Sequence, residues 1–221
     1  MSVFATGVLL AASATVWPKL DYVGDVALPH PHGKPASNVV VVVDAGHGGK
    51  DAGAYSCSGK AEKEVNLMLA DDVASALTNL GYRVVMTRSD DRTVGLYERP
   101  AVGVMHDADA FISIHHNAPG AGMDPKQVRY RSVYAWNPLG DALAVAIANQ
   151  LGCESMRANF AVTRNPEIPS CLVEADFITH PDGERAAWNA SVRKAVAGRI
   201  AIGFHDWRTN ATVALPATVA Q

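Results

Sequence analysis

Residues 38–49 read NVVVVVDAGHGG, five consecutive valines that lead into an aspartate and a glycine-rich loop. A short, continuous β-branched run is typical of a strand that is buried on both faces, as in a parallel sheet. The glycines indicate that this strand ends in a loop after residue 44. We therefore expect residues 38–44 to form a central strand of an α/β fold.

Strand and helix patterns alternate along the chain that follows. Apolar residues recur at helical spacing over residues 64–80, and Gly81 stands where a helix C-cap is expected. We predict further strands at 83–87, 110–115, 131–136 and 171–174, and further helices at 96–106, 138–151 and 183–207. Repeated strand–helix units predict the α/β class, here a three-layer αβα sandwich with a mostly parallel, twisted sheet of about six strands.

Composition excludes several classes of protein. The 221 residues are 48% hydrophobic and carry a net charge of −3, which suits one folded domain rather than an intrinsically disordered chain. The absence of a basic excess argues against nucleic acid as the partner. The three cysteines, Cys57, Cys153 and Cys171, form no CxxC pair and allow at most one disulfide.

The two ends of the chain differ from the middle. Residues 1–37 form an N-terminal segment that begins with an uncharged apolar run and ends in a proline-rich linker. This run resembles a secretory signal peptide without the usual basic start, or else an element packed on the domain. It is too short and too diluted by polar residues for a stable membrane span. We expect the folded domain at 38–208 and a flexible tail at 209–221.

Polar residues follow the ends of three predicted strands. Sites in open α/β sheets form beyond the carboxyl ends of the strands. His47 follows the first strand, His115 ends the third, and Glu174 ends the last. Glu62 and Glu64 lie near the start of the first helix, which opens on the same side of a parallel sheet. We therefore expect two histidines and two carboxylates to converge on one rim.

Each of these residues also has an ordinary structural interpretation. The loop around His47 matches neither GxxxxGK[ST] nor GxGxxG, so a nucleotide site is disfavoured. A lone histidine at a strand end, or a glutamate in a first helical turn, is usually structural. A carboxylate such as Glu174 within a short apolar strand needs a partner or a chemical role. Together, His, Glu and His fit a catalytic zinc site with three protein ligands, and Glu174 fits the base that takes a proton from water.

Five separated motifs make the sequence resemble a known family. They read VVVDAGHGGKDAGA, EKEVNL, TRSDD, FISIHHNA and CLVEADFITHPDGE, in this order between residues 38 and 207. In identity and order they resemble the zinc-dependent N-acetylmuramoyl-L-alanine amidases of the amidase 3 family. The resemblance implies one Zn²⁺ per chain, held by His47, Glu62 rather than Glu64, and His115. It also implies that Glu174 is the catalytic carboxylate.

The resemblance implies a substrate and a location as well. The bond to be hydrolysed is the amide between N-acetylmuramic acid and L-alanine in peptidoglycan, so we expect an exported monomer, periplasmic or extracellular, with peptidoglycan as its partner. A zinc peptidase that cuts within the stem peptide is one alternative. A non-catalytic peptidoglycan-binding module is another, although every residue that the chemistry needs is present.

Other positions qualify this interpretation. Arg88 and Arg99 match further motif positions and are expected to support the site, and Asp44 is a candidate partner for a ligand histidine. The residues that depart from the family pattern are Ala45, His116, Asn117, Asp176 and His180. They are expected to affect substrate preference rather than metal chemistry. The connection 118–130 is short and contains Gly and Pro, so we expect no occluding helix and a site that is open without an activator.

Overall fold

The structure is a computed structural model that describes residues 33–120 and 122–209. The predicted signal segment and most of the predicted tail lie outside these described residues. The elements, in chain order, are η1 (Ala36–Asn38), β1 (Val40–Ala45), α1 (Glu62–Asn79), β2 (Arg83–Met86), α2 (Glu98–Met105), β3 (Ala110–Asn117), β4 (Ser132–Ala135), α3 (Pro138–Leu151), β5 (Glu154–Arg157), η2 (Ala161–Thr163), β6 (Ser170–Phe177), α4 (Pro181–Trp188) and α5 (Ala190–Thr209).

The six strands form one sheet in the order β2-β1-β3-β6-β4-β5. Strands β2, β1, β3 and β6 run parallel to one another. β4 pairs antiparallel with β6, and β5 then pairs parallel with β4. The predicted α/β class and the number of strands are thus confirmed, with one reversal of direction between β6 and β4.

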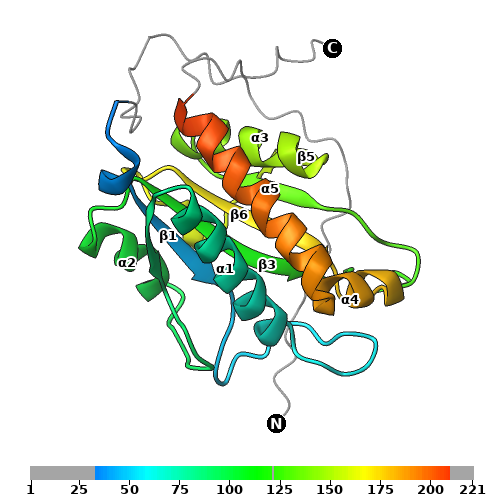
Figure 1. Ribbon diagram of the computed structural model, residues 1–221. Helices are drawn as coiled ribbons and strands as arrows, with labels where there is room; N and C mark the ends of the chain where they lie inside the picture. Colours follow the sequence, from blue (N-terminus) through cyan, green and yellow to red (C-terminus); the bar gives the residue numbers. More distant parts are fainter. Residues whose placement is uncertain (1–32, 121, 210–221) are drawn as a thin grey trace, which may run out of the picture.

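The two faces of the sheet are covered unequally. Helices α1, α3 and α5 cover one face, and Figure 1 shows α1 and α5 side by side in front of the strands. Val41, Val43 and Ile112 of the sheet pack in this larger core with Leu69 of α1 and Phe204 of α5. The opposite face is covered by α2 and η2 over a smaller set of buried residues, namely Val40, Val42, Ala108, Phe111, Val162, Ile168 and Leu172. The predicted three layers are present, and the second helical layer is the thinner one.

Two elements differ from the prediction. β5 reads ESMR, lacks β-branched residues and lies mostly exposed at the sheet edge, so no apolar pattern marks it as a strand. The single helix predicted at 183–207 is two helices, α4 and α5. Asn189 separates them with an extended backbone, and its side-chain oxygen accepts hydrogen bonds from the backbone N–H groups of Ser191 and Val192. A local side-chain cap therefore replaces the continued helix at this residue.

The carboxyl ends of β1, β3 and β6 lie next to one another. The register pairs Ala45 with Ile114 and His115 with Glu174. α1 begins on the same side, where the Glu62 N–H donates to the Ala54 carbonyl. The predicted convergence at one rim is therefore confirmed, since the reversal of direction comes only after β6. Within residues 33–120 and 122–209, none of the helices combines the length and the hydrophobicity that a membrane span requires.

Candidate metal centre

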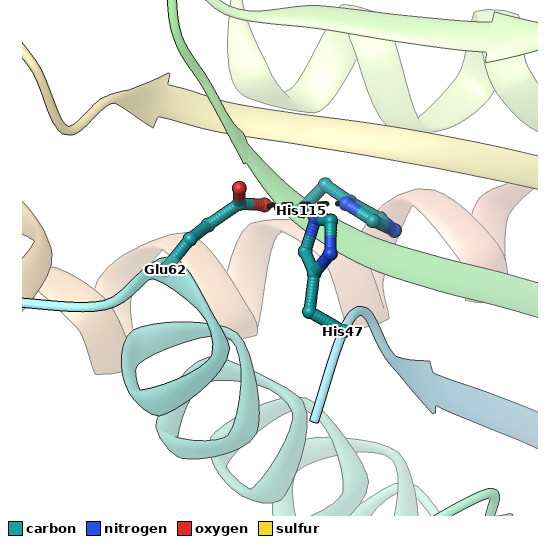
Figure 2. Close-up of side chains that lie close together, drawn as sticks. All are labelled: His47, Glu62 and His115. Carbon is teal, nitrogen blue, oxygen red and sulfur yellow. Dashed lines mark hydrogen bonds and ion pairs between the residues drawn. The ribbon is translucent and has the colours of Figure 1, made fainter. Parts of the chain in front are cut away.

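Three side chains from different elements meet at this rim. His47 comes from the loop after β1, Glu62 from the first turn of α1 and His115 from β3 (Figure 2). One possible ligand atom from each lies within 4.8 Å of the others. His47 Nε2 and His115 Nδ1 each lie 3.2 Å from the same oxygen, Oε1 of Glu62. Two imidazoles and one carboxylate are donor types that zinc accepts, so this group could hold a metal ion.

Two glycines allow the loop to pass close to these ligands. A Cβ at Gly46 would lie 2.3 Å from Nε2 of His115, and a Cβ at Gly53 would lie 2.6 Å from Oε2 of Glu62. His47 itself has a φ of 60°, in the left-handed region that few non-glycine residues adopt. The glycine-rich sequence around His47 therefore serves close packing against the ligands.

Glu62 is buried and held by several donors. Its Oε2 accepts from the Ala54 N–H at 2.9 Å, and its Oε1 accepts from Asn66 Nδ2 at 2.9 Å and from the His116 N–H at 3.2 Å. Burial by itself would raise the pKa of Glu62, but hydrogen bonds and charge from His115 and His47 outweigh burial and lower it. Glu62 is thus an ionised carboxylate directed at both histidines. Glu64, in contrast, is exposed.

Asp51 is a second carboxylate that contacts His47, on the ring nitrogen that does not face Glu62. Its Oδ2 lies 2.8 Å from Nδ1 of His47. Burial opposes protonation of His47, but Glu62 and Asp51 together raise its pKa to about 9. A carboxylate on the second nitrogen of a metal-ligating histidine is a common arrangement, because it fixes the tautomer and the ring orientation.

The prediction that Asp44 is such a partner is wrong. Asp44 is fully buried and accepts hydrogen bonds from Thr87 and Ser113 at 2.6 and 2.7 Å and from Arg99 at 2.8 Å. It lies within strand β1, whereas His47 lies beyond the end of that strand in the loop. Asp44 therefore anchors Arg99 and contacts no ligand histidine.

Arg88 and Arg99 hold the backbone of the His47 loop. Arg88 donates from Nε to the Ala45 carbonyl at 2.9 Å and from NH2 to the Gly46 carbonyl at 2.9 Å. Arg99 donates to the carbonyls of Ala45 and His47, both at 2.8 Å. Three successive carbonyls therefore have a buried guanidinium as partner, which agrees with the supporting role expected for both arginines.

Glu174 is the remaining carboxylate at this rim. It faces His115 across the β3–β6 pair, and its Oε2 is buried without a hydrogen-bond partner among the described residues. Burial raises the pKa of Glu174 to about 7; the charge of Glu62 adds to this rise, while His115 and His47 oppose it. A carboxyl group with a pKa near neutrality can both accept and return a proton.

Comparison with known proteins identifies the family. The profile described as N-acetylmuramoyl-L-alanine amidase, Amidase_3, matches residues 41–206, which include every residue of this rim. The chain belongs to this amidase family. N-acetylmuramoyl-L-alanine amidase AmiA of Escherichia coli (strain K12) is 30% identical over 241 residues, covering 81% of this chain and 82% of AmiA.

Solved structures of amidases share the fold. AmiC2 of Nostoc punctiforme matches with a TM-score of 0.71 and 32% identity, covering 76% of this chain and 96% of AmiC2. The catalytic domain of CwlV from Bacillus (Paenibacillus) polymyxa var. colistinus matches with a TM-score of 0.71 and 31% identity, covering 76% of this chain and 97% of CwlV.

Three of the residues that we expect to depart from the amidase pattern have defined contacts. His116 is buried and lies 2.8 Å from the Asn66 side-chain oxygen, and burial lowers its pKa to about 4, so it is neutral. Both carboxylate oxygens of Asp176 accept from Arg129 at 2.9 Å. His180 caps α4 by accepting from the Asp182 N–H at 3.1 Å. None of these three side chains belongs to the His47–Glu62–His115 group.

Proposed function

We propose that this protein hydrolyses the amide bond between N-acetylmuramic acid and L-alanine in peptidoglycan, using one Zn²⁺ held by His47, Glu62 and His115. The observation that carries the proposal is the meeting of these three donors with Glu174 in a chain of the amidase family. Glu174 is a buried carboxylate, one oxygen of which has no hydrogen-bond partner within residues 33–120 and 122–209. The relatives AmiA and AmiC2 are named for the same bond.

The donor set fits zinc. Three protein ligands of this type leave a coordination position open, as catalytic zinc sites do. Bound there, zinc would supply Lewis-acid chemistry that polarises the amide carbonyl and acidifies water. Asp51 supports this role, because its contact with Nδ1 of His47 leaves Nε2 directed at the Glu62 carboxylate.

Glu174 moves the proton that hydrolysis requires. As an ionised carboxylate it accepts a proton from the attacking water while the water oxygen bonds to the amide carbon. As a carboxylic acid it then returns that proton to the amide nitrogen while the C–N bond breaks. The products are the free carboxyl group of the muramic acid lactyl ether and a peptide with a free L-alanine amino group.

The two candidate ligand histidines are partly open to solvent. The side chains of His47 and His115 are 23% and 18% exposed. Between β3 and β4 the described residues, 118–120 and 122–131, contain no helix that could cover the site. This supports a site that is open without an activator.

We also propose that the protein acts outside the cytoplasm, because its substrate is the cell wall. Similar proteins include the probable cell wall amidase LytH of Staphylococcus epidermidis (strain ATCC 12228 / FDA PCI 1200), 30% identical over 182 residues, covering 78% of this chain and 60% of LytH. We propose a monomer, which sedimentation of the purified protein would test.

Product analysis of a peptidoglycan digest tests the function directly. Zinc-loaded protein is incubated with purified peptidoglycan, and the released fragments are identified by mass spectrometry, with Glu174→Gln as the matched control. We expect intact glycan strands and free peptides that begin with L-alanine. Peptides with another first residue would indicate a stem-peptide peptidase, and binding without any product would indicate a non-catalytic module.

A further inference from the structure

A hollow lies on the same rim as the candidate metal centre, beyond Glu174. It has a volume of about 540 Å³, which lies within the usual range for ligand pockets. Its lining residues, which we call the β4–β5 groove, are Tyr130, Arg131, Gly152, Cys153, Glu154 and Met156. Because β4 and β5 run opposite to β6, their first residues lie at the same edge of the sheet as the last residues of β6.

The strand register connects this groove to the site. His115 pairs with Glu174, Glu174 with Ser132, and Ser132 with Glu154. Paired residues on neighbouring strands share one face of the sheet. The row therefore leads from a candidate metal ligand past the proton carrier to Glu154, over about 14 Å for three strand spacings. Arg131 directly precedes Ser132, so it lines the groove from the other face of the sheet.

The direction of proton transfer orients the substrate along this row. Glu174 returns its proton to the departing nitrogen, so that nitrogen must face Glu174. The acyl carbon and the sugar that bears it then lie toward the metal ligands. The peptide begins at the departing nitrogen, and its chain continues away from the metal centre, where the β4–β5 groove lies. This step rests on the proposed function.

We propose that the β4–β5 groove binds the stem peptide and that Arg131 pairs with a peptide carboxylate. Arg131 donates from Nε to the Ala175 carbonyl at 2.9 Å, which fixes its position. Its NH2 lies 3.8 Å from Asp176, whose two oxygens already accept from Arg129 at 2.9 Å. The Arg131 side chain is 32% exposed, so its guanidinium keeps donors for a ligand carboxylate.

The other walls suit a peptide as well. Tyr130 and Met156 are 50% and 36% exposed and offer apolar surface to the groove. Glu154 adds an exposed carboxylate that would attract a peptide amine. The groove therefore offers both charges and apolar contact, as a short peptide with carboxylates and an amine requires.

Two soluble substrates that differ in one group test the role of Arg131. They are N-acetylmuramoyl-L-alanyl-D-glutamine, whose α-carboxylate is the only free carboxylate of its peptide, and the matching D-glutamine α-amide, which has no free carboxylate. We expect Arg131→Gln to raise KM for the acid about 10-fold, since a hydrogen-bonded charge pair is lost, with kcat changed less than about twofold. KM for the amide should change little. Arg157→Gln is the matched control, because Arg157 lies on β5 but pairs with Asp141 outside the groove.

A binding measurement gives a readout that does not depend on turnover. In protein labelled with ¹³C-methyl methionine, titration with free L-alanyl-D-glutamine should shift the methyl signal of Met156. Met105, at the end of α2 and 77% exposed, serves as the internal control. Met156→Glu should raise KM for the acid several-fold and leave the amide unchanged, because it places a second anion in the groove.

The possible outcomes distinguish failure of the groove proposal from failure of the proposed function. Equal losses for acid and amide, a loss confined to kcat, or the same loss in Arg157→Gln would overturn the role of Arg131. If the protein releases L-alanyl peptides from peptidoglycan but the Met156 methyl signal does not respond to the peptide, the groove proposal alone fails. If folded, zinc-loaded protein releases no such peptides, the proposed function fails and the groove proposal with it.

Discussion

The two halves of the sheet differ in whether the charged side chains compared below are buried or exposed. In the β2-β1-β3-β6 half, Asp44, Arg88 and Arg99 are buried and hold the loop that carries His47. At the β4–β5 edge, Glu154 and Arg157 are exposed. Buried, fully bonded polar groups hold one geometry, whereas exposed side chains adapt. The half with the candidate metal ligands is thus suited to a fixed geometry, and the β4–β5 edge is suited to the peptide contact proposed above.

The same contrast appears between two ion pairs. Arg99 and Asp44 lie 2.8 Å apart with side chains 5% and 0% exposed. Arg157 pairs with Asp141 while its own side chain is 51% exposed. Removing one partner of a buried pair leaves an uncompensated charge in a dry site, whereas water replaces the lost partner at the surface. We therefore expect the loss of the buried pair to lower the free energy of unfolding more than the loss of the exposed pair.

The largest effect is expected for His47→Ala. Loss of one of three ligands should weaken zinc binding by more than about 100-fold, beyond what loss of a ligand's hydrogen-bond partner typically costs, and should abolish hydrolysis. Elemental analysis of the purified variant measures bound zinc. His106→Ala changes an exposed histidine outside the candidate centre and should keep full zinc content. Equal zinc in both variants would remove His47 from the ligand set.

The next largest effect is expected for Glu174→Gln. This change keeps the shape of the side chain but removes proton transfer, so kcat should fall about 10²–10⁴-fold while bound zinc and the unfolding midpoint stay near the wild-type values. A near wild-type rate on peptidoglycan would show that Glu174 is not the proton carrier.

The pH profile gives a second measure of Glu174. Because its pKa is raised to about 7 without metal, and a bound cation would shift it downward, the rate should rise with pH at or below about 7 as the carboxylate ionises. The residual activity of Glu174→Gln should lack this rise. If the rate of Glu174→Gln still rises with pH over this range, another group causes the rise.

Loss of the buried Arg99–Asp44 ion pair should lower the stability of the fold. Arg99→Gln leaves Asp44 without its cation and should lower the free energy of unfolding by about 3–5 kcal/mol, measured by urea denaturation. Arg157→Gln removes the exposed pair and should cost less than about 1 kcal/mol. Similar losses in the two variants would mean that the two halves of the sheet do not differ in this way.

Periodicity and strand ends in the sequence were enough to predict most of the fold and the converging residues. The valine run before His47 predicts a buried parallel strand. The polar residues at the ends of β1, β3 and β6 predict the common rim. β5 was missed because ESMR carries no apolar pattern, and its strand conformation comes from pairing with β4. The break at Asn189 was missed because it depends on a local cap within a pattern that reads as one helix.

The partner of His47 shows what the sequence pattern could not decide. Asp44 precedes His47 by three residues and Asp51 follows it by four, so both are near in the chain. Side chains alternate along a strand, and Asp44 in β1 faces Ser113 and Arg99. Asp51 reaches His47 because the loop turns back, with hydrogen bonds between Gly48 and Asp51 in both directions. The glycines around His47 indicate a loop, but they do not predict that this loop turns back and brings Asp51 to His47.

The smallest effect is therefore expected for Asp51→Asn. The amide still contacts Nδ1 of His47 but removes the negative charge that helps to raise the pKa of His47. Zinc affinity should fall about 10–100-fold, the usual cost of losing a carboxylate behind a ligand histidine. Competition with a chelator of known affinity measures this change. Asp91→Asn is the matched control, since Asp91 accepts from the Gly49 N–H and from Lys63 in the same loop region but contacts neither histidine. If the two variants lose zinc affinity equally, the cause is a general loss of negative charge near the site rather than the direct contact of the Asp51 carboxylate with His47.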